Sequence, residues 1–385
     1  MRSDQECVKT TCATKEPAER EPSPAAGGVR PLLTVVIPTL NEAETLPLLL
    51  ADLNQQAGVA PEIVVGDGGS TDATCSLAAS LGARVVNAER GRGAQMNTAA
   101  QQAGGEYFLF LHADCRLNDP GLLAKALSAL QQAEREQPCI AGHFRLRFLR
   151  TTQRNRLAYR YLEGKTALNR VNTTNGDQGM LLSRHFFARL GGFDPSLPFL
   201  EDQRIAAKIR AQGQWITLPG CLTTSARRFE SEEFHRRYLL MAMMMGFYSL
   251  GETSFFLRAP GVYRVQRETG RLLLSPFFAL VWRMIREDWG FAGSVRAFLR
   301  LGRYLLENAW QVFFFLDVCM QPLLGANRSP LLAAYDRFIA PCLRFRPLNG
   351  LAGLLCFAWF MGVLAPYFWL SETLAAANKG ARITT

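Results

Sequence analysis

The stretch VVIPTLNE, residues 35–42, decides the fold of this chain of 385 residues, because its apolar run ends abruptly in polar and acidic residues. The same change recurs at IVVGDGGSTD (63–72), VVNAERGRG (85–93) and FLFLHAD (108–114). Short apolar runs that alternate with helical stretches are typical of βα units in a mostly parallel sheet. Ligands of such sheets bind beyond the carboxyl ends of the strands. Acidic, glycine-rich and arginine-rich loops at one sheet edge therefore predict a site for a metal-bound phosphorylated ligand.

The remaining elements follow from periodicity and from helix start and stop signals. Asn41, with Glu44 three residues later, predicts a capping box at the start of a helix that continues through Leu53. Further helices are expected at 72–81, 93–103, 120–135, 184–190 and 202–211, and further strands at 140–150, 179–183 and 215–218. The fold class is therefore α/β.

Charge and hydropathy divide the chain into three parts. Residues 1–31 contain no apolar signal segment and predict a disordered lead-in, followed by an α/β domain at 32–232. Residues 227–385 carry +8 of the net charge of +10, and the helical region 233–385 is rich in aromatic residues and methionine. This composition favours an anionic membrane surface over nucleic acid, since no zinc-finger spacing or RNA-binding aromatic signature is present in the sequence.

An uncharged run of 25 residues, 347–371, is long enough to cross a bilayer, which requires about 20 residues. We therefore expect a membrane segment at about 348–370; the alternatives are a buried core helix and a re-entrant hairpin broken at Pro366. The nine cysteines are scattered without a CxxC pair, which is typical of a reducing compartment. The expected location is the cytoplasmic side of the inner (cell) membrane.

Three phosphate-binding or metal-dependent site types can be tested against the sequence. A P-loop requires GxxxxGK[ST], which the sequence lacks, and a dinucleotide fingerprint requires GxGxxG after the first strand, where PTLNE stands instead. A two-metal nuclease would need more clustered carboxylates than Asp114. What remains is a nucleotide held by an acidic loop at Asp67, with Mg²⁺ or Mn²⁺ at Asp114.

Seven motifs follow one another along residues 32–232. They are VVIPTLNE (35–42), GDGGSTD (66–72), RGRGAQMN (90–97), FLHAD (110–114), GDQG (176–179), LED (200–202) and TSARRFE (224–230). In this order and spacing they resemble the motifs of family 2 glycosyltransferases, which have the GT-A fold. Within that family, the chain is similar to a bacterial group described as radical-SAM/selenodomain-associated transferases.

The resemblance implies a donor site for a nucleotide-diphosphate sugar. Glu42 and Asp67 match the acidic residues that hold the base and ribose, and Pro38 and Thr39 would line the same pocket. Arg92 stands where a basic residue would meet the donor diphosphate. For these residues the alternatives are structural: Glu42 in a helix cap, Asp67 in a glycine-rich turn, and Arg92 as a solvated charge.

The resemblance also implies a metal ligand and a catalytic base. Asp114 matches the last carboxylate of the DxD motif, but His112 replaces the first one and would contact ribose or metal. Asp202, preceded by Glu201, matches the base that removes the acceptor proton, which implies direct displacement with inversion. Asp177 would contact the acceptor or the donor sugar; its alternative is a turn residue. Glu201 and Asp202 could instead only cap the following helix.

Two other functions are compatible with the same sheet. A sugar nucleotidyltransferase normally has a glycine-rich loop with Lys or Arg directly after the first strand, where residues 38–42 do not fit. A non-catalytic membrane adaptor would lack the motif carboxylates, which this sequence retains. The expected function is a metal-dependent glycosyltransferase, and the hypothesis for its acceptor is a lipid or lipid-linked molecule.

Overall fold

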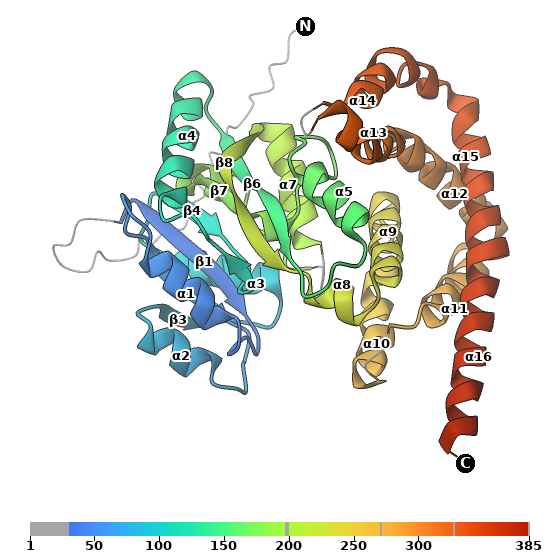
Figure 1. Cartoon of the computed structure of the whole chain (residues 1–385), viewed down its shortest axis with the longest axis horizontal. Helices are drawn as coiled ribbons and strands as arrows, with labels where there is room; N and C mark the ends of the chain where they lie inside the picture. Colours follow the sequence, from blue (N-terminus) through green and yellow to red (C-terminus); the bar gives the residue numbers. More distant parts are fainter. Residues whose placement is uncertain (1–30, 197–199, 270–271, 326–327, 384–385) are drawn as a thin grey trace, which may run out of the picture. The chain divides into compact units, whose positions relative to one another are not determined.

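A mixed eight-stranded sheet forms the centre of the α/β region (Figure 1). The computed structural model describes residues 31–196, 200–269, 272–325 and 328–383. The strand order is β3-β2-β1-β4-β7-β6-β8-β5. The strands are β1 (Leu33–Thr39), β2 (Glu62–Asp67), β3 (Arg84–Asn87), β4 (Tyr107–Phe110), β5 (Cys115–Arg116), β6 (Ile140–Leu149), β7 (Met180–Ser183) and β8 (Gln214–Ser225).

The first four strands are parallel, as the sequence predicts. Thr39 at the end of β1 pairs with Asp67 at the end of β2, and β4 pairs with the other side of β1. The loops that follow these strands therefore meet at one edge. Strand β7 is antiparallel to β4 and β6, and β6 is parallel to β8. The expected α/β class is confirmed, but the sheet is mixed, since four of its seven strand pairs are parallel and three are antiparallel.

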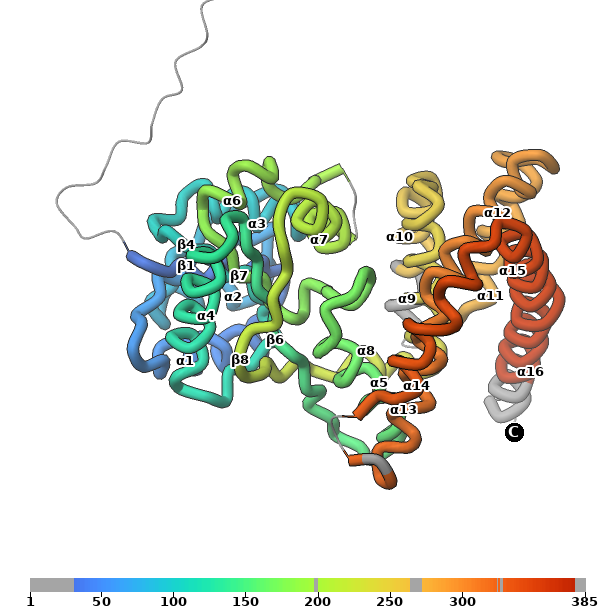
Figure 2. Tube along the Cα trace, turned by 90° about the horizontal axis from the view of Figure 1, so that it is seen from above, coloured from blue at the N-terminus to red at the C-terminus, as the bar shows by residue number. Residues whose placement is uncertain are grey.

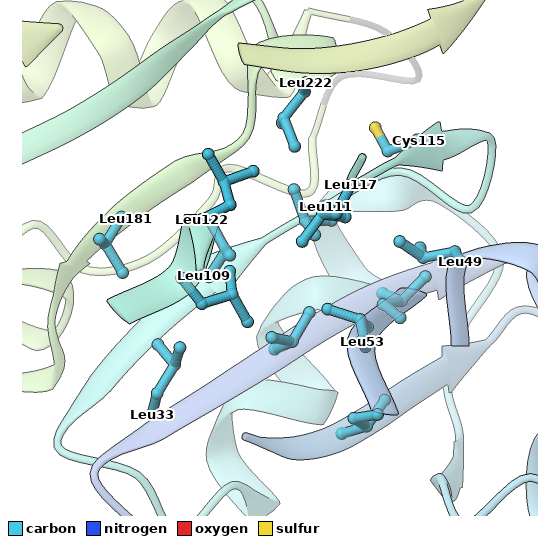
Figure 3. Close-up of a cluster of buried hydrophobic side chains, with 14 of the residues drawn as sticks. Leu33, Leu49, Leu53, Leu109, Leu111, Cys115, Leu117, Leu122, Leu181 and Leu222 are labelled. Atoms are coloured by element: carbon cyan, nitrogen blue, oxygen red, sulfur yellow. The ribbon is translucent and has the colours of Figure 1, made fainter. Parts of the chain in front are cut away.

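Helices cover both faces of this sheet because alternate strand residues point to opposite sides. Val35 and Ile37 of β1 pack in one core, and Val36 packs in the other. Figure 3 shows the first core, in which Leu109 of β4 lies among side chains that include Leu53 of α1. The helices of this region are α1 (Leu46–Asn54), α2 (Thr74–Ser80), α3 (Arg92–Gln102), α4 (Leu122–Glu136), α5 (Arg156–Thr166), α6 (Arg184–Arg189) and α7 (Glu201–Gln212), with a 3₁₀ turn at Gly176–Gln178.

Two local expectations were wrong. Asn41 does not cap α1: its backbone has a φ of 56°, and its side-chain oxygen accepts a hydrogen bond from the Thr71 N–H at 2.8 Å. It joins the loops after β1 and β2 instead. The strand expected at 215–218 extends to Ser225, because the chain passes Gly220 with a φ of 87° and continues in the sheet. A glycine can adopt this conformation without the steric cost that a side chain would add.

The C-terminal region is helical, as predicted (Figure 1). It packs against the α/β region through polar contacts: the Tyr161 hydroxyl donates to Gln311 Oε1 at 2.9 Å, and Arg170 forms an ion pair with Asp336. Its helices are α8 (Arg227–Ser231), α9 (Phe234–Leu250), α10 (Thr253–Thr269), α11 (Ser275–Arg283), α12 (Gly290–Glu307), α13 (Trp310–Leu324), α14 (Pro330–Ala334), α15 (Arg346–Trp359) and α16 (Ala365–Ile383). Short π or 3₁₀ segments lie at Met284–Trp289, Tyr335–Ile339, Cys342–Arg344 and Phe360–Leu364.

Within the described ranges, one helix is long and apolar enough to cross a membrane by length and composition. It comprises Arg346–Ala377, and 6% of its most apolar window is buried. The predicted boundary at 232/233 stays a prediction, because Pro31–Thr385 cluster as one compact unit. Apart from Pro31, the lead-in expected at 1–31 lies outside the described residues.

Candidate active site

A cleft at the carboxyl ends of β1 and β4 brings most of the predicted site residues together. It encloses about 780 Å³ of space that is partly open to solvent. The predicted residues that line it are Pro38, Glu42, Arg92, His112, Asp114 and Asp177. Asp202 lines a neighbouring cavity, and the lining of the cleft does not include Thr39, Asp67 or Glu201.

Asp67 is buried beneath the glycine-rich loop that follows β2. Its carboxylate accepts hydrogen bonds from the N–H groups of Gly69 (2.9 Å) and Ser70 (2.8 Å) and from the hydroxyls of Ser70 and Thr39. Burial raises the pKa of Asp67, but these hydrogen bonds outweigh it, and the pKa is lowered overall. Because a carboxylate offers about four lone-pair sites, this one is fully engaged by its own loop and by Thr39 at the end of β1. Asp67 therefore shapes the loop, with no free acceptor site for a ligand.

Glu42 faces the cleft from the loop after β1. One carboxylate oxygen accepts a hydrogen bond from the Thr45 hydroxyl at 2.7 Å, and the Glu42 backbone N–H donates to the Thr74 hydroxyl at 2.9 Å. The loop is thereby held by both α1 and the start of α2. Glu42 keeps acceptor sites free for a polar ligand.

His112 and Asp177 form an ion pair at the base of the cleft. The distance between His112 Nδ1 and Asp177 Oδ1 is 2.6 Å. Burial lowers the pKa of His112, but the hydrogen bond to Asp177 and the charges of Asp177 and Asp114 raise it overall. Burial likewise raises the pKa of Asp177, and the His112 hydrogen bond and charge bring it well below its usual range. Both shifts favour a protonated His112 that donates to an ionised Asp177.

Asp114 follows β4 and has a different environment. In the part of the chain that the structure describes, its carboxylate accepts no hydrogen bond from another residue. Burial and the nearby charge of Asp177 raise its pKa, against the charges of His112 and Arg228. A desolvated carboxylate beside a second carboxylate is stabilised by a cation. This arrangement fits Mg²⁺ or Mn²⁺, which proteins often hold through one or two carboxylates plus substrate phosphates. The described residues contain no group of three or more possible ligands.

Helix α3 begins at Arg92. A cationic side chain and the N-terminus of a helix therefore lie together at the cleft. Its guanidinium Nη1 lies 3.8 Å from Glu201 Oε1, and nearly half of the side chain remains exposed. Helix N-termini carry partial positive charge and favour anions. The position suits a diphosphate.

Glu201 and Asp202 begin α7 but have distinct surroundings. Asp202 accepts hydrogen bonds from the Gly176 N–H at 2.7 Å and the Gln203 N–H at 2.8 Å. It lines a smaller cavity of about 400 Å³, which shares His112 with the cleft. Glu201 is 3% exposed; burial and the charge of Asp202 raise its pKa, while Arg92 opposes this. Asp202 is thus positioned by the backbone, and Glu201 is paired with Arg92.

Three more arginines line the cleft: Arg227 and Arg228, which stand in the TSARRFE motif, and Arg237, which the sequence analysis missed. Arg228 and Arg237 line the side opposite β1, together with Met241. Burial lowers the pKa of Arg228, and the charges of Arg92 and Arg237 lower it further. Arg237 pairs with Glu232 at 3.3 Å, whereas Arg228 forms no ion pair within the described ranges. Arg228 therefore adds positive charge that an anionic ligand would neutralise.

Three buried glutamines hold the site loops through backbone carbonyls, and the sequence analysis missed them. Gln95 Nε2 donates to Gly66 O at 3.1 Å, and Gln203 Nε2 donates to Thr174 O at 2.9 Å. Gln178 Nε2 lies 3.1 Å from Phe144 O and 3.0 Å from Thr166 O. All three residues stand inside or beside quoted motifs. For Gln178 and Gln203 the signal that could have found them is a neutral amide next to a motif acid, since such a residue brings donors without charge. Gln95 has no acidic neighbour and carries no such signal.

Comparison with known protein families gives a match over part of the α/β region. Residues 34–191 match the model of "Glycosyl transferase family 2". The match covers less than half of the chain, and it supports a transferase. The range includes all of the predicted site residues except Glu201 and Asp202, whose roles rest on position. The narrower radical-SAM-associated group stays a prediction.

Curated relatives include glycosyltransferases of Mycobacterium bovis and Mycobacterium tuberculosis that are named for PGL/p-HBAD biosynthesis. Each is 34% identical over 111 residues, which is 27% of this chain. The chain spans only 43% of the length of these relatives.

Solved structures similar to the chain include a mannosyltransferase of Pyrobaculum calidifontis in complex with GDP-Man and Mn²⁺ (20% identity, TM-score 0.40, 91% of this chain and 81% of that chain). Another is S. aureus TarS 1–349 in complex with UDP (15% identity, TM-score 0.43, 84% and 88%). At these TM-scores the likeness carries no argument about this chain.

Proposed function

We propose that this chain transfers a hexosyl group from a nucleotide-diphosphate sugar to an acceptor hydroxyl, with Mg²⁺ or Mn²⁺ and with inversion at the anomeric carbon. The observation that carries the proposal is the cleft itself. It combines Asp114, a carboxylate that accepts no hydrogen bond within the described ranges, with Arg92 and Arg228, which present positive charge. A cation site beside an anion site is what a metal-bound diphosphate requires. The family match of residues 34–191 supports this reading.

On the donor side, Pro38, Glu42 and the Asp67 loop form the nucleoside end of the cleft. Glu42 accepts hydrogen bonds from the base or ribose, while Asp67 acts indirectly by fixing the Gly69 and Ser70 backbone. Asp114 and Asp177 would hold the cation. When bound, the cation supplies positive charge that stabilises the departing diphosphate.

The displacement needs a base on the acceptor side. Asp202 takes the proton from the acceptor hydroxyl as the acceptor oxygen bonds to the anomeric carbon, and the bond from that carbon to the diphosphate oxygen breaks. Its backbone hydrogen bonds at Gly176 and Gln203 hold the carboxylate in place. Glu201 keeps Arg92 in position for the diphosphate, and Arg92 and Arg228 stabilise the charge that develops there.

A lipid-linked acceptor at the cytoplasmic side of the cell membrane is part of the proposal. Support comes from Met241 and Phe229, which give the acceptor side of the cleft an apolar lining beside Arg228. The apolar segment at 348–370 would provide the membrane contact.

A donor screen tests the proposal. Full-length protein is incubated with common nucleotide sugars and Mn²⁺, and release of the nucleoside diphosphate is measured beside equilibrium binding. We expect one donor to be hydrolysed slowly without acceptor, and expect Asp114→Ala and Asp202→Ala to abolish or strongly reduce turnover. Glu136→Gln, an exposed change on α4, serves as the control.

Each other outcome selects another function. Formation of a sugar nucleotide from a nucleoside triphosphate and a sugar phosphate would identify a nucleotidyltransferase. Absence of both binding and turnover for every donor would leave the adaptor function. Equal activity of Asp114→Ala and the wild type would overturn the assigned metal site.

A further inference from the structure

Helix α12 and the first half of the helix Arg346–Ala377 pack as a close antiparallel pair (Figure 2). A Cβ atom at Gly302 would lie 2.1 Å from Asn349 O, and one at Gly353 would lie 2.3 Å from Phe298 O. The rings of Phe298 and Phe357 are 4.9 Å apart. The two backbones are in contact at the glycines, and these contacts fix the register between α12 and α15.

The second half of the long helix is held by a buried polar anchor. Glu372 pairs with Arg236 and accepts hydrogen bonds from the N–H groups of Leu274 (3.0 Å) and Ser275 (3.1 Å). Phe368 stacks on Phe278 at 5.9 Å. One face of the helix therefore packs against the rest of the protein along both halves.

The opposite face is apolar and exposed. On the long helix Leu354 is 64% exposed and Trp369 is 63% exposed, and on α12 Phe291 is 88% exposed. Other exposed apolar residues on these helices are Val295, Leu299, Leu351, Leu355, Trp359, Val363, Tyr367 and Leu370. We call this set the apolar face. Exposed apolar surface on this scale indicates a partner.

The charges around the apolar face select that partner. Eight exposed arginines of this region form no ion pair within the described ranges: Arg283, Arg286, Arg296, Arg300, Arg328, Arg337, Arg344 and Arg346. The carboxylates nearby are mostly engaged, as in the Arg258–Asp288 and Arg303–Glu307 pairs. A second copy of this surface would be repelled, whereas anionic lipid headgroups would neutralise it.

The position of α12 decides how the long helix meets the bilayer. Arg296 and Arg300 flank Phe298, which lies beside Gly353 and Phe357. If 347–371 crossed the membrane, residues 349–357 would lie about 3–15 Å deep at about 1.5 Å per residue. A hydrocarbon core is about 30 Å thick, so these residues and the arginines beside them would lie inside it, between one boundary and the middle. A charged arginine inside the hydrocarbon is unfavourable.

We propose that α12 and the helix Arg346–Ala377 lie flat on an anionic membrane surface and do not cross it. Helices of this kind place aromatic and aliphatic residues at the headgroup boundary and arginines at the lipid phosphates. The surface connects with the cleft, because Arg236, which holds Glu372, precedes Arg237 of the cleft lining on α9. This proposal does not depend on the proposed sugar transfer, but it rests on the proposed location at the cytoplasmic side of the membrane.

Vesicle flotation tests the partner. Full-length protein is mixed with vesicles of phosphatidylcholine alone or with added phosphatidylglycerol. We expect binding to the anionic vesicles, and expect Arg296→Glu with Arg300→Glu to weaken it by at least about tenfold. The matched control is Arg145→Glu with Arg147→Glu, the same charge change at exposed positions of β6. Equal loss in both variants, or a stable dimer that binds no vesicles, would overturn the proposal.

Thiol labelling tests the orientation. Exposed Cys342 precedes the long helix, and Ala377→Cys places a thiol at its end. In inside-out membrane vesicles from cells that produce the protein, a membrane-impermeant maleimide should label both positions before detergent is added, as read by peptide mass spectrometry. Protection of one position until the vesicles are lysed would show that the helix crosses.

Discussion

The α/β region and the C-terminal helices use apolar residues in opposite ways. Strand β1 is buried along its whole length, with its side chains divided between two cores. The long C-terminal helix leaves residues such as Leu354 and Trp359 more than half exposed. The first region completes its own core and concentrates charge in one cleft. The second exposes apolar side chains and arginines to solvent. This exposure indicates that the region binds a partner outside the chain.

The largest effect is expected in the cleft, from the removal of one charge. Asp114→Asn should lower transfer on the order of 10²–10³-fold, by analogy with the removal of one group that stabilises transition-state charge. It should leave the free energy of unfolding unchanged or slightly increased, because the carboxylate is desolvated and accepts no hydrogen bond within the described ranges. Donor turnover and thermal unfolding of the same samples measure both. Activity within a few-fold of wild type would separate the cleft from catalysis.

Acid should destabilise the α/β region through His143. Burial lowers the pKa of His143 to about 4, below its usual value near 6.5 in an unfolded chain. The unfolded state therefore binds the proton more readily between these values. Stability is complete above about pH 6.5 and falls by roughly 3 kcal/mol as the pH drops towards 4.

Urea unfolding at a series of pH values tests this slope. His143→Asn should flatten it, although the variant also loses the ring contact with Trp215 and begins from lower stability. His235→Asn, at an exposed position of α9, is the control and should keep the slope. An unchanged slope in His143→Asn would place the acid-sensitive group elsewhere.

The side-chain amide of Gln178 should stabilise the loop that contains Asp177. Gln178→Met keeps the approximate shape of the side chain but removes its partners at Phe144 O, Thr166 O and the Asn175 N–H. Buried backbone groups left unpaired should cost about 2 kcal/mol of stability, measured by urea unfolding. Gln101→Met, an exposed change on α3, should cost little. Equal stability of the two variants would show that water or other groups replace Gln178.

Much of the α/β region could be predicted because its signals are local. Strand runs, helix periods and strand-end acids lie close together in sequence, and parallel pairing brings their loops to one edge. Asp114, which follows a strand directly, was found for this reason, whereas the role of Arg92 came from the family resemblance. The error at Asn41 has a tertiary cause: its side chain bonds to Thr71, 30 residues away, instead of capping the adjacent helix.

What the sequence could not reveal depends on partners far along the chain. Gln178 contacts carbonyls of β6 and α5, and Arg228 reaches the cleft only because β8 returns to it. Whether the uncharged run 347–371 crosses a membrane also depends on residues far along the chain. Its composition is that of a crossing helix, but the arginines beside it belong to α12, which the chain passes some 50 residues earlier.

The smallest effect on stability is expected on the apolar face, and this makes it the sharpest test of the contrast between the regions. Leu354→Asp should change the free energy of unfolding by no more than about 0.5 kcal/mol, because the side chain is already 64% exposed. The same change at Leu123 of α4, which is 1% exposed, should cost several kcal/mol or prevent folding, since it buries an unpaired charge. Leu354→Asp should nevertheless reduce vesicle binding and raise solubility without lipid. If Leu354→Asp destabilises the isolated protein as strongly as Leu123→Asp, the apolar face is covered by protein in solution, and the two regions do not differ in the way described.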